Sequence, residues 1–399
     1  MYPLLKNMRV IEGAAFIAGP SCCLHLAQMG AKVIRFDSLK GAPDGARWPV
    51  APNGASYYWE GLNKGKRSIA INLEMPEGRQ LAQRLAASGD GLFVTNYPVD
   101  GFLSYERLSA LRSNLICLRV MGWANGAPAV DYTVNAAVGV PYMTGHSDDK
   151  RPVNHVLPAW DLMAGAYSAF ALLAAERERR ASGRGRELRL ALSDLAAATL
   201  GNLGQVAEVS ASGADRPRSG NDIFGAFGRD FLTADGERLM IVAITPRQWS
   251  GLVQALAIGT AVTALEKTTG VSFAIEGARY IHRETLFQIV EAVVRARRSE
   301  DLAASFDAAG VCWSRYQALT RALSVDGRLF ADNPIFSPVS HATTGTYATP
   351  GAALRIPSED RLSADSAPRL GQHTDQVLSE LLGLNGAEIG RLHDEGIVA

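Results

Sequence analysis

The sequence predicts an α/β fold with an open, mostly parallel, Rossmann-like sheet and a smaller α+β domain. In the first 190 residues, short apolar runs typical of buried strands alternate with longer stretches of helical periodicity. The first unit reads as strand 9–12, a helix from Gly19-Pro20 to Gly30, and strand 32–36. A strand–helix–strand unit of this kind makes its two strands parallel neighbours. After residue 202 the pattern changes to a hairpin followed by helices.

Each element of the predicted sheet has its own local signal. Pro20 suits the first turn of a helix, where its missing N–H costs nothing, and Gly30 is a typical helix end. Further strands are expected at 69–71, 91–94, 115–120 and 187–190, and further helices at 77–87, 105–111 and 158–183.

The chain is long enough for two or three domains. Residues 210–221 are rich in Gly, Ser, Pro, Asp and Arg, a composition typical of a linker or lid. Beyond them the sequence predicts a hairpin around Asp235-Gly236, helices over 246–310 and a strand at 311–315. We therefore expect three segments: a large α/β domain (1–210), a linker with a small α+β domain (211–329), and a return to the large domain (330–399).

The composition argues against several classes of partner. Forty basic residues balance forty acidic ones, so no net charge steers the chain toward nucleic acid. The longest weakly polar run, 164–175, is too short to cross a membrane, and the first ten residues do not read as a signal peptide. Four scattered cysteines and seven scattered histidines show no metal-site spacing. We expect a cytoplasmic protein with no metal and no membrane partner.

Familiar catalytic motifs are missing, but two basic features remain. Residues 13–20 lack the G-x-G-x-x-G pattern, and there is no phosphate-binding loop and no G-x-S-x-G elbow. Residues 63–68 place three cations beside a strand, where they either hold a phosphate or are simply solvated. Arg35 and Arg47 flank the loop after the second strand.

Asp161 is the candidate catalytic residue. Pro158 begins a helix, so Asp161 falls in the first turn, where free N–H groups and the helix dipole favour a carboxylate. From the residues alone, such an aspartate is more often a helix stabiliser than a catalyst. His155, just before the helix, is likewise more often a satisfied polar group than a base.

The order and spacing of several short runs give the chain a likeness to known enzymes. These runs are Ala18-Gly19-Pro20, 26–35, 63–69, Asn96-Tyr97, Asp131, Asp161, 183–185, 217–221 and 370–374. Together they resemble the family III CoA-transferases, the group that contains formyl-CoA transferase and alpha-methylacyl-CoA racemase.

The resemblance implies a fold, a substrate and a site. It implies an open α/β domain with a small domain, and two chains interlocked as a homodimer. Coenzyme A would enter as part of an acyl-CoA substrate, with no prosthetic group. Asp161 would become acylated and then carry CoA. The expected CoA contacts are Ile17, Ala18, Arg35, Ser38, Asn72, Leu73, Asn96 and Tyr97.

Longer runs resemble one branch of this family, which moves CoA intramolecularly between the two carboxyl groups of mesaconate. They include 131–135, 153–161, 224–231 and 392–399. Here Val130, Asp131 and His155 are the expected substrate residues, with His155 holding the free carboxylate. Backbone N–H groups at the start of the Asp161 helix are expected to stabilise the oxyanions.

Several positions differ from the patterns of other family members, and these differences bear on the alternative activities. Ile17 stands where formyl-CoA transferase has glutamine, and a tetraglycine loop is missing, which weakens transfer between two separate acids. Val130 stands where the racemases have a catalytic histidine. The altered segment 96–101 leaves that part of the CoA contact open. An intermolecular transferase, a racemase and a catalytically silent CoA-binding protein remain the alternatives.

Overall fold

Six parallel strands form the sheet of the larger of two units, in the order β3-β2-β1-β4-β5-β6. The strands are β1 (Arg9–Gly13), β2 (Lys32–Ser38), β3 (Arg67–Ile71), β4 (Leu92–Thr95), β5 (Ile116–Met121) and β6 (Arg186–Ala191). The order reverses direction between β1 and β4, as in a doubly wound nucleotide-binding fold. The Rossmann-like sheet predicted from the alternating pattern is confirmed.

The computed structural model describes all 399 residues and divides them into two compact units. The larger unit contains Met1–Val138, His155–Ala211 and Asp332–Ala399, and the smaller contains Gly139–Asn154 and Ser212–Ala331.

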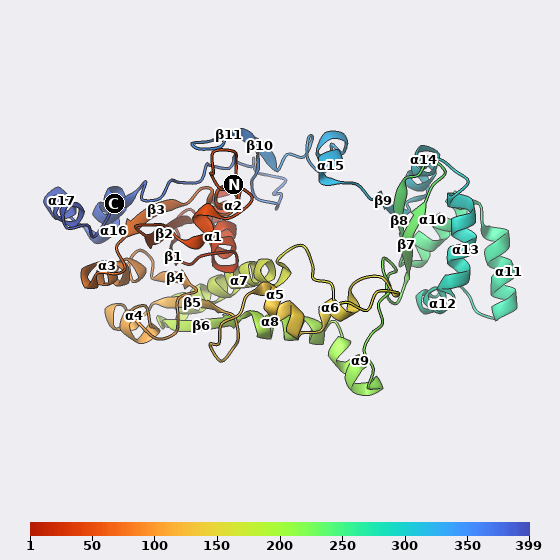
Figure 1. Cartoon of the computed structure of the whole chain (residues 1–399), viewed down its shortest axis with the longest axis horizontal. Helices are drawn as coiled ribbons and strands as arrows, with labels where there is room; N and C mark the ends of the chain where they lie inside the picture. Colours follow the sequence, from red (N-terminus) through yellow and green to blue (C-terminus); the bar gives the residue numbers. More distant parts are fainter. The chain divides into compact units, whose positions relative to one another are not determined.

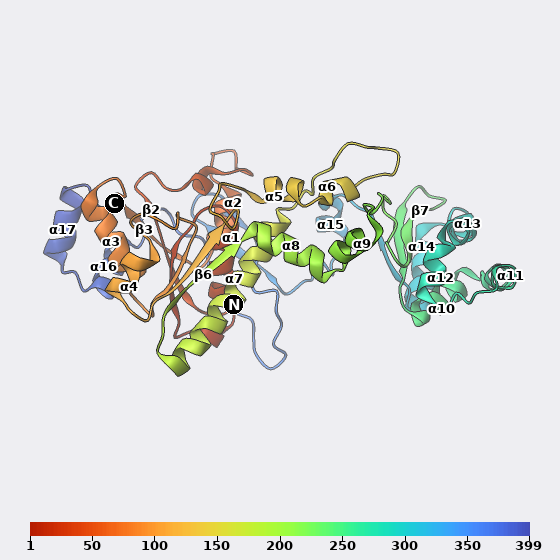
Figure 2. The ribbon, with the colours of Figure 1, turned by 90° about the horizontal axis from the view of Figure 1, so that it is seen from below.

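Helices cover both faces of the six-stranded sheet (Figure 1). α1 (Ala18–Gln28) and α7 (Ala159–Ser182) lie against one face, and α3 (Pro76–Ala86) and α4 (Tyr105–Leu111) against the other. The same two layers are seen from below in Figure 2. The other helical segments of this unit are η1 (Pro3–Leu5), η2 (Pro43–Ala46), α2 (Tyr57–Asn63), α5 (Asp131–Ala137), α8 (Leu192–Asn202), α9 (Gln205–Ser212), α16 (Thr374–Leu382) and α17 (Gly386–Asp394).

The last part of the chain packs on the first. The Asn72 N–H donates to the carbonyl of Ile397 over 2.7 Å, so the C-terminal segment continues the edge of the sheet beyond β3. The hairpin β10 (Phe336–His341) and β11 (Gly345–Pro350) is bound to α2. Its Thr343, Thr344 and Tyr347 hydroxyls all donate to the buried Glu60 carboxylate.

The smaller unit is an α+β structure built on an antiparallel sheet, as expected from its hairpin and helical patterns. Its strands are β7 (Phe227–Leu232), β8 (Arg238–Ala243) and β9 (Cys312–Arg315). Its helices are α6 (Val140–Met143), α10 (Pro246–Leu256), α11 (Gly259–Thr269), α12 (Glu276–Ile281), α13 (Arg283–Val294), α14 (Ser299–Ala309) and α15 (Leu319–Val325). Phe227, Trp249 and Phe287 form the aromatic centre of its core.

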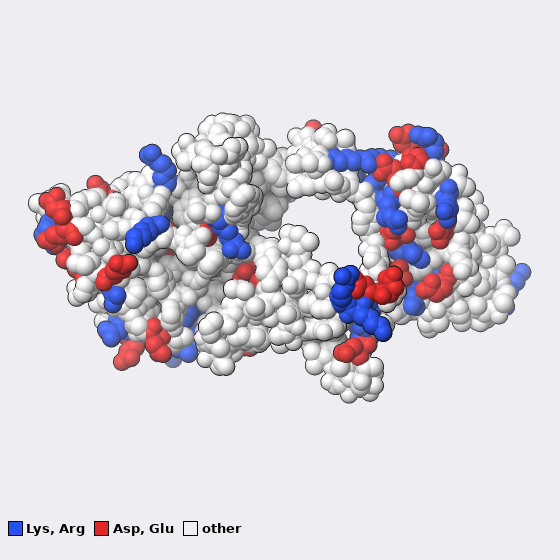
Figure 3. Space-filling view, viewed as in Figure 1, with Lys and Arg blue, Asp and Glu red and all other residues white.

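The surface drawn in Figure 3 carries charges of both signs. Basic and acidic side chains on that face are interspersed rather than gathered into a stripe of one sign. None of the helices combines the length and apolar character that a membrane span requires. No group of three or more His, Cys, Asp or Glu side chains is placed to hold a metal ion.

Gly165 allows α7 to approach α1 closely. A Cβ atom added at Gly165 would lie 1.9 Å from Ser21 Oγ and 3.1 Å from the carbonyl oxygen of Ala18. Gly165 lies four residues, about one turn, after Asp161, so this contact also brings Asp161 toward the start of α1. The distance between these helices therefore depends on the missing side chain.

We predict that Gly165→Ala destabilises the fold by about 1–3 kcal/mol, because the added methyl group overlaps backbone and side-chain atoms of α1. The measurement is the free energy of unfolding in urea. Gly201→Ala is the matched control, since no atom lies within 4 Å of the position of its Cβ on α8. That change should be neutral or stabilise by about 0.5–1 kcal/mol. Equal effects of the two variants would contradict the close contact.

Candidate active site

A cavity of about 880 Å³ opens in the larger unit where the strand order reverses. Its wall is formed by the segments that follow three neighbouring strands: 15–18 after β1, 96–100 after β4, and 119–122 at the end of β5. Residues 124–132 and the side chains of Arg47, Tyr58, Asp161, Arg189 and Leu192 complete it. The volume is typical of a small-molecule or cofactor site.

The cavity brings together seven of the residues expected at the site. Four expected CoA contacts line it, as do two expected substrate residues and the candidate nucleophile: Ile17, Ala18, Asn96, Tyr97, Val130, Asp131 and Asp161. Arg35, Ser38, Asn72 and Leu73 do not line it, and His155 lies behind Asp131.

Two pairs of hydrogen bonds fix the loops after β1 and β4. The side-chain amide of Asn96 accepts from the Ala15 N–H over 3.2 Å and donates to the Ala15 carbonyl over 3.1 Å. The buried Arg119 guanidinium donates to the carbonyls of Tyr97 and Pro98 over 2.6 and 2.9 Å. The altered loop that begins at Asn96 is therefore held rigidly at the cavity rim.

Phe16 adopts an unusual backbone conformation at the cavity wall. Its φ is +69°, in the left-handed region that residues other than glycine rarely occupy. Such a conformation costs about 1–3 kcal/mol and persists where the surroundings determine it. The residue directly precedes Ile17, the N-cap of α1, and its ring lies beneath the Arg47 guanidinium.

Asp131 caps the helix that carries the candidate nucleophile. Its buried carboxylate accepts hydrogen bonds from the backbone N–H groups of Trp160 and Asp161, over 2.6 and 3.1 Å. Its other oxygen lies 2.7 Å from Nε2 of His155. A carboxylate from one helix thus satisfies the free N–H groups at the start of another.

Two expectations about this helix start need correction. The N–H groups of Trp160 and Asp161 are bound to Asp131, so they are not available to stabilise an oxyanion. His155 was expected to hold the free carboxylate of the substrate, but its Nε2 is paired with Asp131. Its ring also packs between those of Tyr132 and Trp160, with centroids 5.8 and 6.2 Å away. His155 therefore supports Asp131 from behind.

The environment of Asp161 makes its carboxyl group unusually basic. Burial and the neighbouring Asp131 carboxylate raise the pKa of Asp161 to about 7, against the opposing effect of Arg47. Both causes penalise the ionised form. A carboxyl group with a pKa near neutrality, in a cavity, is a typical functional-site signal.

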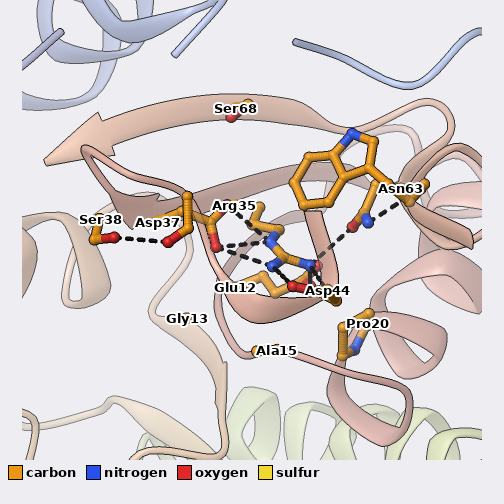
Figure 4. Close-up of polar contacts among 12 residues, drawn as sticks. Glu12, Gly13, Ala15, Pro20, Arg35, Asp37, Ser38, Asp44, Asn63 and Ser68 are labelled. Carbon is orange, nitrogen blue, oxygen red and sulfur yellow. Dashed lines mark hydrogen bonds and ion pairs between the residues drawn. The ribbon is translucent and has the colours of Figure 1, made fainter. Parts of the chain in front are cut away.

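Arg35 is a structural residue rather than a ligand contact. Its side chain is 1% exposed and binds both oxygens of Asp44 over 2.9 Å. It also binds Asp37 and the side-chain oxygen of Asn63, as Figure 4 shows. Every N–H of the guanidinium is used, so we no longer place Arg35 among the CoA contacts.

The lysines of residues 63–68 are buried and engaged as well. Lys66 Nζ lies 2.7 Å from the buried Glu12 carboxylate and donates to Asn63 Oδ1 over 2.9 Å. Lys64 donates to the carbonyl of Gly61, and burial lowers its pKa to about 8. These contacts do not support phosphate binding by this basic run, because both lysines are bound to groups of the protein itself.

The remaining expected CoA contacts lie away from the cavity. Ser38 donates to the carbonyl of Gly41 over 2.7 Å, and Asn72 donates to the carbonyl of Gly396 over 3.0 Å. Leu73 packs against the core beneath α3. Each makes a local structural contact in this conformation.

Sequence reasoning did not single out Tyr58 or the wall formed by 119–129. Tyr58 lies on α2, a seven-residue helix whose first-turn aromatic residues gave no periodic signal. Residues 119–129 follow β5, and only their place at the carboxyl end of a central strand indicates a ligand.

The fold and cavity define an α/β protein with space for a nucleotide-like ligand beside a carboxyl group of raised pKa. Residues 5–374 match the sequence profile of CoA-transferase family III, and the chain belongs to this family. Acyl-CoA thioesters are therefore its class of substrate. The resemblance expected from the sequence is confirmed.

Several relatives match over nearly their full length. The chain is 45% identical to 2-methylfumaryl-CoA isomerase from Chloroflexus aurantiacus, over 100% of this chain and 98% of that protein. It is 27% identical to succinyl-CoA–D-citramalate CoA-transferase from the same organism, over 99% and 98%. The crystal structure of a CAIB/BAIF family protein from Brucella suis has the same fold, with a TM-score of 0.76 and 24% identity over 95% of this chain and 99% of that one.

We predict that Asp161→Asn stabilises the folded protein, and that the gain grows from pH 4 to pH 8. The pKa of Asp161 is raised on folding, so the native state binds the proton more tightly and loses stability as pH rises toward 7. A neutral amide avoids this cost, and we expect a gain of about 2 kcal/mol at pH 8, less than the full shift because the site is partly solvated.

Thermal unfolding of both proteins across this pH range measures the gain. Asp194→Asn is the control, because Asp194 is an exposed carboxylate in the first turn of α8. It should lose a few tenths of a kcal/mol at pH 8 through the helix dipole. A constant difference between Asp161→Asn and the parent at all pH values would contradict the raised pKa.

Proposed function

We propose that the protein is a 2-methylfumaryl-CoA isomerase, which moves CoA from one carboxyl group of mesaconate to the other. The observation that carries the proposal is the 45% identity over the whole chain to an enzyme of that name. The cavity, with Asp161 in its wall, supports the same activity because it places a candidate nucleophile beside a nucleotide-sized space.

The first half of the reaction uses Asp161 as a nucleophile. Its carboxylate attacks the thioester carbonyl, the C–S bond breaks, and CoA thiolate leaves a mixed anhydride between Asp161 and mesaconate. The thiolate then attacks the Asp161 carbonyl and breaks the anhydride C–O bond. The products are an aspartyl-CoA thioester and mesaconate with both carboxylates free.

The second half repeats these steps from the other end of the diacid. The second carboxylate attacks the aspartyl-CoA thioester and expels the thiolate, which then attacks the new mesaconyl carbonyl. This regenerates the Asp161 carboxylate and yields the isomeric thioester. A diacid held in the cavity reacts at high effective concentration, so no second acid needs to enter.

The basicity of Asp161 suits this role. A carboxylate with a pKa near 7 is more nucleophilic than an ordinary one and is still substantially ionised at neutral pH. Asp131 accepts the helix-start N–H bonds that would otherwise stabilise the Asp161 anion and lower its pKa. Asp131 therefore acts as a positioning and tuning residue in the proposed mechanism.

We further propose that the native form is a homodimer with interlocked chains, in which the larger unit binds CoA. Large exposed apolar side chains on α7 and directly after α8 support a second copy as the partner: Tyr167, Phe170 and Leu203 are 51%, 63% and 66% exposed. Light scattering after serial dilution should give the mass of two chains throughout, because interlocked chains cannot part without unfolding. A folded monomer at low concentration would rule the arrangement out.

We propose a cytoplasmic location. The four cysteines, Cys22, Cys23, Cys117 and Cys312, are all free thiols, which suits a reducing compartment.

Asp161→Ala should lower the isomerisation rate by at least about 10³-fold, because the covalent carrier is lost. The measurement is conversion of 2-methylfumaryl-CoA followed by liquid chromatography. Circular dichroism and CoA affinity serve as controls and should stay near those of the parent. A purified, folded variant that keeps more than a few per cent of the activity would end the nucleophile assignment.

The transfer should be intramolecular with respect to the diacid. Unlabelled substrate is incubated with an excess of ¹³C-labelled free mesaconate, and the product of the first turnovers is analysed by mass spectrometry. Retention of the diacid gives unlabelled product. Substantial label would instead indicate transfer between separate acids, as in the succinyl-CoA–D-citramalate relative. Bound CoA without any conversion would favour a silent binding protein, and epimerisation of a 2-methyl stereocentre would favour a racemase.

A further inference from the structure

Arg47 brings an unpaired positive charge to the wall of the cavity. Its guanidinium carbon lies 5.7 Å from the centre of the Phe16 ring and 5.4 Å from that of Tyr58. No oxygen of the protein accepts a hydrogen bond from this guanidinium or forms an ion pair with it. Arg35, in contrast, uses all its donors within the fold. The planar donor fork of Arg47 is therefore free for an anionic ligand.

The Tyr58 hydroxyl is a second unpaired donor in the same wall. Its oxygen is buried and has no hydrogen-bond partner. Burial raises the pKa of Tyr58 to about 12, so the group keeps its proton and stays a donor. A buried hydroxyl without a partner costs free energy unless a ligand satisfies it.

Both donors share the cavity with Asp161 without being bound to it. Arg47 acts on the pKa of Asp161 through charge alone, since the two side chains form no ion pair. The field of Asp161 also reaches Tyr58. The space between the nucleophile and this pair of donors is where an acyl group attached to Asp161 would lie.

The segment that carries these donors is held in place from behind. Asp44 is bound to Arg35, and the Ser56 hydroxyl donates to the carbonyl of Arg47 over 2.5 Å. The Tyr57 N–H donates to the carbonyl of Pro49 over 3.0 Å, which fixes the entry to α2. The donors are thus preorganised before a ligand arrives.

We propose that Arg47, with the Tyr58 hydroxyl beside it, binds the free carboxylate of the acyl group, so that the site selects CoA thioesters of short dicarboxylic acids. This inference rests on the proposed function and assigns it a specificity determinant. While one carboxyl carbon is bonded to Asp161 or CoA, the other carboxylate pairs with Arg47. In the aspartyl-CoA stage the mesaconate dianion turns, so that the carboxylate just released from Asp161 pairs with Arg47 and the carboxylate that Arg47 held before attacks the aspartyl-CoA thioester. Retention of the diacid follows from this charge pair.

The test compares Arg47→Gln with Arg107→Gln, an exposed arginine on α4 that does not line the cavity. Three quantities are measured: kcat/KM for 2-methylfumaryl-CoA, the affinity for CoA alone, and the ¹³C label that free mesaconate contributes to the product. Arg47→Gln should lower kcat/KM by about 10- to 100-fold, as expected for a lost charge-assisted bond. It should also raise the labelled fraction several-fold, because the diacid now escapes, and leave CoA affinity unchanged. Arg107→Gln should alter none of them.

Two results would overturn the inference. If CoA affinity falls in parallel with kcat/KM, Arg47 contacts a phosphate of CoA rather than the acyl carboxylate. If the labelled fraction stays at the parent level although the rate falls, Arg47 does not retain the diacid. Arg47→Lys separates charge from geometry and should recover part of the retention.

A binding experiment keeps this inference distinct from the isomerase proposal. In the Asp161→Asn background, where no anhydride forms, succinyl-CoA and butyryl-CoA differ by the terminal carboxylate. We expect about a tenfold or greater preference for succinyl-CoA, lost when Arg47→Gln is added. If the parent enzyme, with Asp161 in place, leaves 2-methylfumaryl-CoA unconverted while this preference is intact, the isomerase function alone is refuted. A preference that Arg47→Gln does not change would refute the carboxylate site alone.

Discussion

The wall of the active site depends on the buried ion cluster around Arg35. The guanidinium joins β2 to Asp44 in η2 and to Asn63 at the end of α2, and it lies 4.6 Å from the Trp59 ring. The segment between those two anchors includes the arginine and the tyrosine that face the cavity, and this one side chain holds it at both ends. Removing a single member of such a buried cluster typically costs about 3–5 kcal/mol, because the remaining charges lose their partners.

Two carboxylates at one helix start have opposite roles. Asp131 takes the N–H bonds of the first turn of α7 and is shielded from behind by His155. Asp161 does not receive those bonds, and burial together with the like charge of Asp131 raises the pKa of its carboxyl group. The strained Phe16 and the close approach at Gly165 belong to the same arrangement, since both bring the start of α1 toward this point. The two carboxylates thus differ in their partners: Asp131 receives the helix-start bonds, and Asp161 does not.

Local patterns in the sequence predicted the sheet and the place of Asp161 in the first turn of its helix, but not the partners of buried charges. Strands β1 to β5 followed from apolar runs, because burial on both faces leaves a clear signal. Arg35 was interpreted as a ligand residue, since nothing near it indicates that Asp44 and Asn63 fold back onto it. His155 was assigned to the substrate for the same reason, because its pairing with Asp131 joins residues 24 positions apart. Short helices such as α2 and α5 escaped prediction because seven residues give too little periodicity.

The attachment of the β10–β11 hairpin to Glu60 has a consequence for how the protein is made. The Thr343 and Tyr347 hydroxyls reach Glu60 across 283 and 287 positions of sequence, and the Trp59 indole N–H bonds to the carbonyl of Pro368 across 309. Such long closures carry a high entropic cost and form late in folding. On the ribosome, α2 must therefore wait for most of the chain to be synthesised before its supporting contacts exist. Until then its aromatic side chains lack these partners, and transiently exposed apolar surface of this kind promotes aggregation.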